Sequence, residues 1–352
     1  MAALTPEAEE LLTALRQENK MYKNLDRTVL LAIHAARQAV AKAGWQAENE
    51  IAINIGSSRG ATGLLEQYLE EFRMNPTQLS SQTSPTTTLG NISSWVAHDL
   101  QTEGPLISHS VTCSTALQAI ANGFAWLQAG MATRFLAGAA EAPLTPFTVA
   151  QMQAIGIYAK EPENNYWCRP LNAARQNTFV LGEGAALFAL ERIPEKNLTA
   201  ASIILEAIGF GFEKITSKTG ISRAGLNFQK ATRGAIQQLP QNDQTIEAIV
   251  LHAPGTAAGD AAEMNALRAI FGENIPILTS NKLLIGHTLG ASAALSLEYA
   301  VWMLENQKFL RFPYPVFTEE QPKPKIIRRI LLLAAGFGGN ATALVIRKAI
   351  SP

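Results

Sequence analysis

Strand-like and helix-like segments alternate along the chain in two successive cycles. Short apolar runs such as residues 51–56 and 246–251 predict buried strands, and longer runs such as residues 114–127 and 290–305 predict helices. Each cycle closes on strands, which indicates an α/β fold of two similar halves with helices covering the sheets. No Pro/Gly-rich linker separates the halves, residues 24–198 and 199–352, so we expect residues 1–352 to form one folding unit.

Composition excludes several classes of protein. Hydrophobic residues make up 47% of the 352 residues, which is ample for a core. The 29 Lys and Arg residues balance the 29 Asp and Glu residues, so neither a nucleic acid nor an anionic membrane is an expected partner. Two cysteines are too few for a disulfide framework, and neither a signal peptide nor an apolar run of membrane-spanning length is present. We expect a soluble, cytoplasmic protein.

Cys113 is the candidate nucleophile because of its position. It lies where the strand-like run 105–111 meets the helix-like run 114–127. The first N–H groups of a helix favour a thiolate over a thiol, so we expect a reactive sulfur here. The alternative is a buried structural cysteine that packs as a small hydrophobe. The second cysteine, Cys168, has no catalytic context.

Two histidines strengthen the interpretation of Cys113 as a nucleophile. His252 and His287 both follow predicted strands and lie in glycine-rich turns, at the end of the sheet where open α/β folds place their sites. A thiolate with two imidazoles suits acyl transfer through a thioester. His98 and His109 are expected to pack or lie at the surface, outside the site.

Five motifs occur in an order that resembles the elongating β-ketoacyl-acyl-carrier-protein synthases of the thiolase superfamily. The resemblance covers residues 24–352 and implies a thiolase-like fold of two halves, layered α-β-α-β-α. The motifs are Thr112-Cys113-Ser114; Arg169-Pro170 with residues 179–185; His252 with Gly255-Thr256 and Gly259-Asp260; Lys282 with Gly286-His287; and residues 336–340, Gly-Phe-Gly-Gly-Asn.

The resemblance implies a role for each matching residue. Cys113 would take the acyl chain from a carrier protein, and His252 and His287 would bind the malonyl thioester and drive its decarboxylation. Lys282 would order the surroundings of the second histidine. The backbone N–H groups of Cys113 and Phe337 would form the oxyanion hole, with Phe337 also gating the acyl pocket. Further substrate-binding positions would be Thr256, Gly338 and Gly339.

The implied activity is the decarboxylative Claisen condensation of an acyl group on Cys113 with malonyl-carrier protein, in fatty-acid-like, polyketide or polyene biosynthesis. Two histidines beside the cysteine favour an elongating synthase over an initiating synthase or a thiolase. The resemblance implies no metal and no cofactor, since phosphopantetheine of the acyl carrier protein brings the substrates. The expected partners are that carrier protein and a second subunit, in a homodimer or a heterodimer with a related ketosynthase.

Three departures from the family pattern keep an alternative open. The opening strand is missing, Pro254 replaces a threonine that would contact phosphopantetheine, and Ser296 stands where relatives have a glutamate. The alternative is a low-activity subunit, like a chain-length factor, that pairs with an active ketosynthase. A Cys-His hydrolase is a third hypothesis, but no feature of the sequence admits water to an acyl-enzyme.

Overall fold

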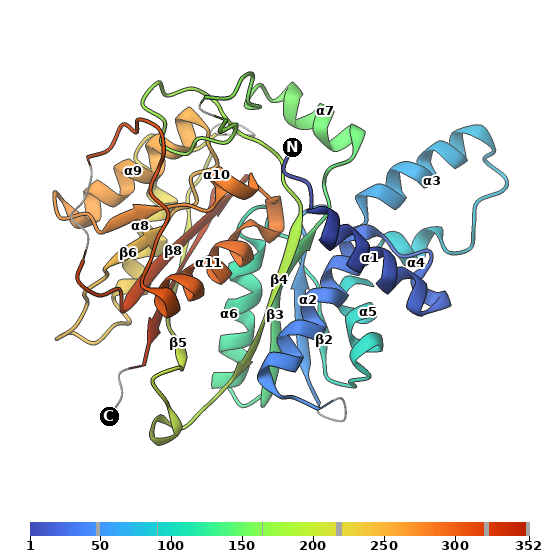
Figure 1. Ribbon diagram of the computed structural model, residues 1–352, viewed down its shortest axis with the longest axis horizontal. Helices are drawn as coiled ribbons and strands as arrows, with labels where there is room; N and C mark the ends of the chain where they lie inside the picture. Colours follow the sequence, from blue (N-terminus) through green and yellow to red (C-terminus); the bar gives the residue numbers. More distant parts are fainter. Residues whose placement is uncertain (47–49, 90, 164, 216–219, 320–323, 350–352) are drawn as a thin grey trace.

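Five layers make up the protein in a computed structural model, which describes residues 1–46, 50–89, 91–163, 165–215, 220–319 and 324–349 (Figure 1). Two mixed sheets alternate with three layers of helices, so the predicted layered α/β fold is confirmed. The first sheet has the order β2 (Leu106–Ile107), β1 (Ala52–Gly56), β3 (Arg134–Glu141), β4 (Gly184–Glu191). The second has the order β5 (Ile203–Phe212), β9 (Asn340–Lys348), β8 (Arg329–Gly336), β6 (Ala248–Val250), β7 (Ile277–Thr279).

Two alanine-rich helices, α6 (Thr115–Gln128) and α11 (Ser292–Asn306), form the middle layer and share one apolar core with both sheets. Small side chains such as Ala116 and Ala300, which are fully buried, let these helices approach both sheets closely. The outer layers bury two further cores. They contain α2 (Arg27–Ala43) and α5 (Asn91–Leu100) on the first sheet, and α8 (Leu226–Ile236) and α9 (Ala257–Phe271) on the second.

The remaining helices lie at the periphery or beside the site. They are α1 (Pro6–Glu18), α3 (Thr62–Met74), α4 (Thr83–Thr87), α7 (Pro146–Ala154) and α10 (Lys282–Ile285), with the 3₁₀ turns η1 (Lys20–Tyr22), η2 (Glu195–Asn197) and η3 (Leu289–Ala291). Capping residues bound the first two long helices: Thr5 accepts a hydrogen bond from the N–H of Ala8, Asp26 accepts one from that of Thr28, and Gly44 ends α2 at φ 66°. No helix in the described residues is long and apolar enough to cross a membrane.

The strand pairings of the two sheets correspond one to one, with a single exception. β1 pairs in parallel with β2 and β3, as β6 does with β7 and β8. β3 pairs antiparallel with β4, as β8 does with β9. Only the second sheet continues, with β5 antiparallel to β9. Among the described residues, the first sheet therefore lacks the counterpart of β5, which agrees with the missing opening strand.

The predicted strand over residues 105–111 is largely wrong, because β2 contains only Leu106 and Ile107. The hydroxyl of Ser93 donates to the carbonyl oxygen of Ile107 at 2.6 Å, in place of a further ladder bond. Thr112 then adopts φ 56°, in the left-handed region, which ends the extended backbone. The chain is thereby turned into α6 directly at Cys113.

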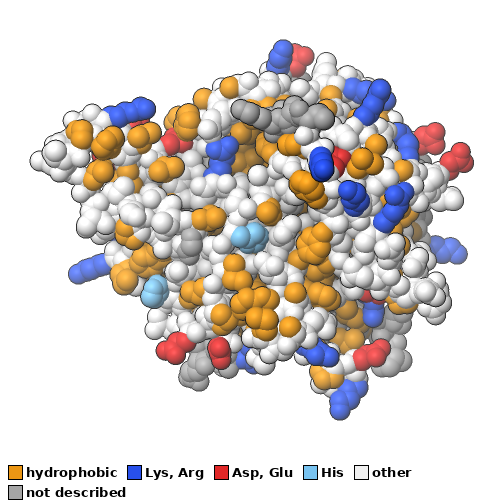
Figure 2. Space-filling view, turned by 180° about the vertical axis from the view of Figure 1, so that it is seen from behind, with side chains coloured by type: hydrophobic (Ala, Val, Ile, Leu, Met, Phe, Trp, Pro, Cys, Tyr) orange, Lys and Arg blue, Asp and Glu red, His pale blue; other side chains and the backbone are white. Residues whose placement is uncertain are grey.

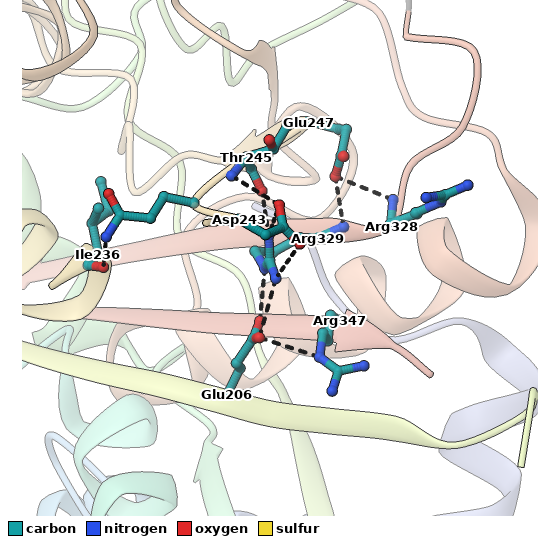
Figure 3. A network of polar contacts seen from close by, with 9 residues as sticks. Glu206, Ile236, Asp243, Thr245, Glu247, Arg328, Arg329 and Arg347 are labelled. Atoms are coloured by element: carbon teal, nitrogen blue, oxygen red, sulfur yellow. Dashed lines mark hydrogen bonds and ion pairs between the residues drawn. The ribbon is translucent and has the colours of Figure 1, made fainter. Parts of the chain in front are cut away.

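A buried arginine holds three strands of the second sheet together at one end (Figure 3). The register of β8 and β9 places Arg329 opposite Arg347, two like charges that would repel. Glu206 of β5 accepts hydrogen bonds from both, at 2.7 Å from Arg329 Nε and 3.2 Å from Arg347 Nε. Asp243 makes a second ion pair with Arg329 at 3.2 Å, and Arg329 is only 5% exposed.

Candidate active site

Cys113 lies at the N-terminus of α6, directly after the left-handed Thr112. Thr115 fixes this junction, since its hydroxyl accepts from the N–H of Val111 at 2.9 Å and donates to the carbonyl of Thr112 at 2.6 Å. The Cys113 side chain is buried in the protein without substrate. The sequence therefore positions the sulfur through backbone geometry at a strand-to-helix turn.

The turn between β8 and β9 covers Cys113. A Cβ atom on Gly336 would lie 1.8 Å from Thr112 Oγ1 and 3.1 Å from the backbone N of Cys113, so only glycine permits this approach. The hydroxyl of Ser114 hydrogen-bonds Asn340 Oδ1 from the other end of the turn. Phe337 follows Gly336 in this turn, and its side chain is 41% exposed.

The two predicted histidines lie against each other. The ring centroids of His252, which follows β6, and His287, which follows α10, are 5.5 Å apart with an interplanar angle of 85°. Aromatic rings hold each imidazole from its other side: Phe228 lies 6.1 Å from His252, and Phe179 lies 5.3 Å from His287, between centroids. The pair is therefore fixed by apolar packing in a buried position.

Both imidazoles are neutral at ordinary pH. Burial, together with the nearby Lys282 ammonium, lowers the pKa of His287 to about 3 and holds that of His252 well below its usual value. The backbone N–H of Leu289 donates to His287 Nδ1 at 3.0 Å. Because Nδ1 accepts this bond, the ring proton of His287 is on Nε2. His287 is thus a hydrogen-bond donor through Nε2.

The thiol of Cys113 is protonated in the resting site. Burial raises its pKa to about 12, assisted by the negative charge of Glu141, while Lys282, Arg59 and a backbone hydrogen bond act in the opposite direction. The expectation that the helix N-terminus makes the thiolate the favoured form is therefore wrong for this state. The partial positive charge at a helix N-terminus stabilises a thiolate by less free energy than the thiolate loses when it is buried away from water.

Lys282 lies behind the histidines, almost completely buried. Its Nζ donates to the carbonyl of Leu251 at 3.2 Å, and burial lowers its pKa. The positive charge of Lys282 lowers the pKa values of Cys113, His252 and His287. Lys282 therefore lies within electrostatic reach of the other three predicted catalytic side chains.

Two buried carboxyl groups hold the loop that carries His252. Glu263 accepts hydrogen bonds from the backbone N–H groups of His252, at 2.8 Å, and Ala253, at 2.7 Å. Asp260 accepts one at 3.2 Å from the N–H of Thr256. Burial raises the pKa of Asp260 and of Glu263 to about 7. Sequence analysis missed Glu263, although its place one helical turn after Asp260 on α9 is a usable signal.

Glu141 is a second buried acid that the sequence analysis missed. Its carboxylate accepts hydrogen bonds from Ser57 Oγ at 2.7 Å, from the N–H of Ser58 at 2.7 Å, from that of Arg59 at 3.0 Å and from that of Gly290 at 2.9 Å. It thereby joins the loop after β1 to η3, which follows His287. The available signal was a single acidic residue ending the apolar strand β3.

The other singled-out residues have simpler surroundings. Thr256 is half-buried at the start of α9, next to Pro254 in the loop after His252. Ser296 is buried and donates to Asn281 Oδ1 at 3.2 Å. Cys168 is buried, near enough to Lys282 for their charges to interact.

The two excluded histidines lie outside the cluster of Cys113, His252, His287 and Lys282. His109 Nδ1 contacts Asn54 Oδ1 at 3.0 Å, and His98 packs beside Trp95 with 5.7 Å between ring centroids.

A buried cysteine at a helix N-terminus can hold an acyl thioester, and a pair of neutral imidazoles can donate hydrogen bonds to a carbonyl oxygen. Two family models match the chain: the N-terminal domain of β-ketoacyl synthase over residues 8–196 and the C-terminal domain over residues 205–312. These matches cover most of the chain. The protein therefore belongs to the β-ketoacyl synthase family.

Individual relatives are distant but match along most of their length. The ketoacyl synthase alpha subunit of the tetracenomycin polyketide synthase of Streptomyces glaucescens is 29% identical, over 92% of this chain and 81% of the relative. The 3-oxoacyl-[acyl-carrier-protein] synthase 2 of Staphylococcus aureus is 25% identical, over 94% of this chain and 84% of the relative. A β-ketoacyl synthase structure from Burkholderia phymatum superposes with a TM-score of 0.80 at 22% identity, over 94% of this chain and 85% of that structure. That likeness confirms the thiolase-like fold.

The buried histidines predict a specific pH dependence of stability. In the unfolded chain His287 takes up a proton near pH 6.5, whereas in the folded protein its pKa is about 3. Folding stability from this residue is therefore lost as pH falls from about 6.5 toward about 3, by ~1.4 kcal/mol per pH unit. A His287→Asn variant lacks this loss. We therefore expect the free energy of unfolding of the variant to rise relative to that of the unaltered protein by ~1.4 kcal/mol for each pH unit of acidification in this range.

Urea unfolding at pH 7.5, 6 and 5 measures this difference. Asp260 and Glu263 titrate in both proteins, so their contribution cancels when the two curves are subtracted. A difference in free energy of unfolding that does not change with pH would contradict a neutral, buried His287.

Proposed function

We propose that the protein is an elongating β-ketoacyl-acyl-carrier-protein synthase that works in polyketide-like or fatty-acid-like biosynthesis. The observation that carries the proposal is a buried Cys113 beneath the turn at Gly336 and a packed pair of neutral imidazoles, His252 and His287, all three within electrostatic reach of Lys282. Intact catalytic side chains favour this function over that of a non-catalytic partner subunit. The tetracenomycin relative and the 3-oxoacyl synthase relative are compatible with either pathway class.

In the first half-reaction the Cys113 sulfur attacks the carbonyl of an acyl-carrier thioester. The C–S bond to the carrier breaks, and the carrier thiol leaves with the proton that Cys113 gives up. The backbone N–H groups of Cys113 and Phe337 stabilise the oxyanion of the tetrahedral intermediate. Because the resting thiol has a pKa of about 12, proton removal must accompany attack when substrate fills the pocket.

In the second half-reaction malonyl-carrier protein loses CO₂, and the electron pair of the broken C–C bond forms an enolate. The Nε2–H of His287 and an N–H of His252 donate to the thioester oxygen where that charge develops. The enolate carbon attacks the acyl group on Cys113, the Cys113 C–S bond breaks, and the sulfur is reprotonated. Burial and, after it, the positive charge of Lys282 lower the pKa values of both histidines and keep them neutral.

The proposed partners are an acyl carrier protein and a second ketosynthase-like subunit. One solved neighbour, with a TM-score of 0.81 at 21% identity, is a type II polyketide ketosynthase in complex with its acyl-carrier protein. Another, with a TM-score of 0.76, is a ketosynthase/chain length factor.

The first sheet runs from β4 at the front of Figure 1 to β2 at the back. Figure 2 shows apolar side chains gathered near the centre of that back face, which suits subunit pairing.

Intact-mass spectrometry with a panel of acyl-carrier thioesters tests the function. We expect an acyl adduct on Cys113 that disappears when malonyl-carrier protein is added, with a β-ketoacyl product formed, and no adduct on a Cys113→Ala variant. A folded protein that takes no adduct from any thioester would refute the synthase function. Activity that then appears in a separate synthase on mixing would assign the chain the role of a partner subunit.

A further inference from the structure

The loop that follows β1, residues 57–60, lies against the turn that carries Cys113. A Cβ atom on Gly56, the last residue of β1, would lie 2.1 Å from Cγ2 of the buried Thr115, two residues after the cysteine. No side chain fits in that space, so β1 ends directly against the start of α6. The loop therefore begins next to the reacting residue, and it contributes one charged side chain, Arg59.

The same loop also contacts the segment that follows His287. A Cβ atom on Gly290 would lie 2.6 Å from the backbone N of Ser58. The Glu141 carboxylate accepts hydrogen bonds from the backbone N–H groups of Arg59, at 3.0 Å, and of Gly290, at 2.9 Å. The backbone of Arg59 is therefore fixed between the start of α6 and η3.

The Arg59 side chain extends from this backbone to α7 and is half-buried. Its Nη1 donates to Oε1 of Gln151 at 2.6 Å, which holds the guanidinium in place. Gln151 precedes Met152, which packs in one buried apolar cluster with Phe179. Within the described residues, no carboxylate lies at ion-pair distance from this guanidinium. A partly buried cation without such a partner is stabilised when an anion binds it.

The charges around the sulfur indicate where an anion can bind. Burial raises the pKa of Cys113 to about 12, assisted by the negative charge of Glu141. The positive charges of Lys282 and Arg59 lower this pKa. Lys282 already has a place in the proposed mechanism beside the histidines, whereas Arg59 has none. Because Glu141 repels a second carboxylate next to the thioester, an anion bound by Arg59 belongs at the far end of the acyl chain.

A guanidinium distinguishes a carboxylate from other oxygen groups by geometry. It donates two parallel N–H bonds to the two carboxylate oxygens, whereas a hydroxyl or an isolated carbonyl offers only one oxygen. The bond to Gln151 uses Nη1 and leaves Nε and Nη2 of Arg59 to donate in this way. The apolar cluster of Met152 and Phe179 suits the methylene groups between the thioester and the carboxylate.

We propose that Arg59 determines substrate specificity by binding a carboxylate at the end of the acyl chain that Cys113 receives. The preferred acyl donors are half-thioesters of straight-chain dicarboxylic acids, and not unsubstituted fatty acyl groups. This inference rests on the proposed synthase function, because it concerns the acyl group of the first half-reaction.

Pairs of carrier thioesters with equal chain length test the preference. The pairs are succinyl with butyryl, adipoyl with hexanoyl, and suberoyl with octanoyl. Intact-mass spectrometry follows acyl loading on Cys113 and gives kcat/KM for each donor. We expect the carboxylate-bearing member to load about tenfold faster or more in the pair whose length reaches Arg59. A neutral member that loads as fast or faster in every pair would overturn the proposal.

Variants of Arg59 separate binding of the carboxylate from support of the loop. We expect Arg59→Gln to reduce the kcat/KM ratio of the carboxylate-bearing to the neutral donor by about tenfold or more, and Arg59→Lys to retain part of that ratio. Arg268→Gln removes the same charge from the exposed side of α9 and should leave the ratio unchanged. If Arg59→Gln slowed both donors equally, Arg59 would only hold the loop to α7, and the proposal would be wrong.

Binding without acyl transfer distinguishes failure of this inference from failure of the synthase function. Pantetheine amides of the same acyl groups, with nitrogen in place of the thioester sulfur, bind without loading Cys113. In calorimetry we expect the carboxylate-bearing amide to bind about tenfold tighter or more, and Arg59→Gln to remove the difference. This result would support the carboxylate site even if no thioester loaded the cysteine. Loading without any such difference in binding would refute the site and leave the synthase function intact.

The malonyl group also carries a carboxylate, so the extender is the alternative ligand of Arg59. The rate of condensation, measured at varied concentrations of malonyl-carrier protein, distinguishes the two. We expect Arg59→Gln to change the loading ratio and to leave the KM for malonyl-carrier protein within about twofold. A raised KM with an unchanged loading ratio would assign Arg59 to the extender and overturn the proposal.

Discussion

A His287→Phe variant is expected to load an acyl group onto Cys113 at a nearly unchanged rate and to lose condensation by about 10²–10³-fold, the usual cost of one oxyanion donor. Phenylalanine keeps the apolar contact with Phe179 but removes the Nε2–H that points away from Leu289. In the proposed mechanism the acyl-transfer step depends on Cys113 and on the backbone N–H groups of Cys113 and Phe337, which this substitution does not change.

Rapid-quench mass spectrometry separates the two steps, because the acyl-enzyme and the β-ketoacyl product differ in mass and in the molecule that carries them. His109→Phe is a suitable control, since His109 lies against Asn54 outside the catalytic cluster. If His287→Phe slowed acyl loading as much as condensation, His287 would be acting on Cys113 itself and the assignment of roles would be wrong.

Replacing Arg329 by methionine is expected to reduce the free energy of unfolding by about 3–5 kcal/mol, the usual cost of removing one partner from a buried ion pair. The substitution leaves Glu206, whose side chain is 13% exposed, with only the partly exposed Arg347 as a partner, at the irregularity in the β5–β9 register. It also removes the hydrogen bond from Arg329 Nη1 to the carbonyl of Thr245. Denaturant unfolding measures the loss.

Arg328→Met is the matched control for this prediction. Arg328 is the preceding residue and its side chain is exposed, so its replacement should change the free energy of unfolding by no more than about 0.5 kcal/mol. In a double variant, Arg329→Met with Glu206→Met, the unpaired carboxylate is gone and much of the stability should return. Equal losses in the single and double variants would mean that packing, and not the buried charge, makes Arg329 important.

The clustering of Cys113, His252 and His287 was predictable because each residue follows a strand or a turn at one end of a sheet. Strand order in an α/β fold brings such ends together, whatever their separation in sequence. The protonation state of Cys113 was not predictable in the same way. It depends on burial by the turn at Gly336 and on the charge of Glu141, and both come from segments distant in sequence.

Glu141 and Glu263 illustrate a second limit of sequence reasoning. Each acts by accepting hydrogen bonds from backbone N–H groups of loops that approach only in the folded chain. Backbone donors have no signature in the sequence, so an acid that binds them cannot be distinguished from a surface acid by spacing alone. The missing strand was visible from the sequence, whereas the approach of the loop after β1 to Cys113 was not.

The high pKa of Cys113 also bears on how the protein withstands chemical damage. Peroxides and alkylating agents react with thiolates, and a thiol whose pKa is about 12 is almost entirely protonated at neutral pH. Cys168, whose pKa burial also raises to about 12, has the same protection. Neither cysteine is therefore an easy target in the idle protein. In the proposed mechanism the sulfur loses its proton only during attack on an acyl donor, which limits inactivation between turnovers.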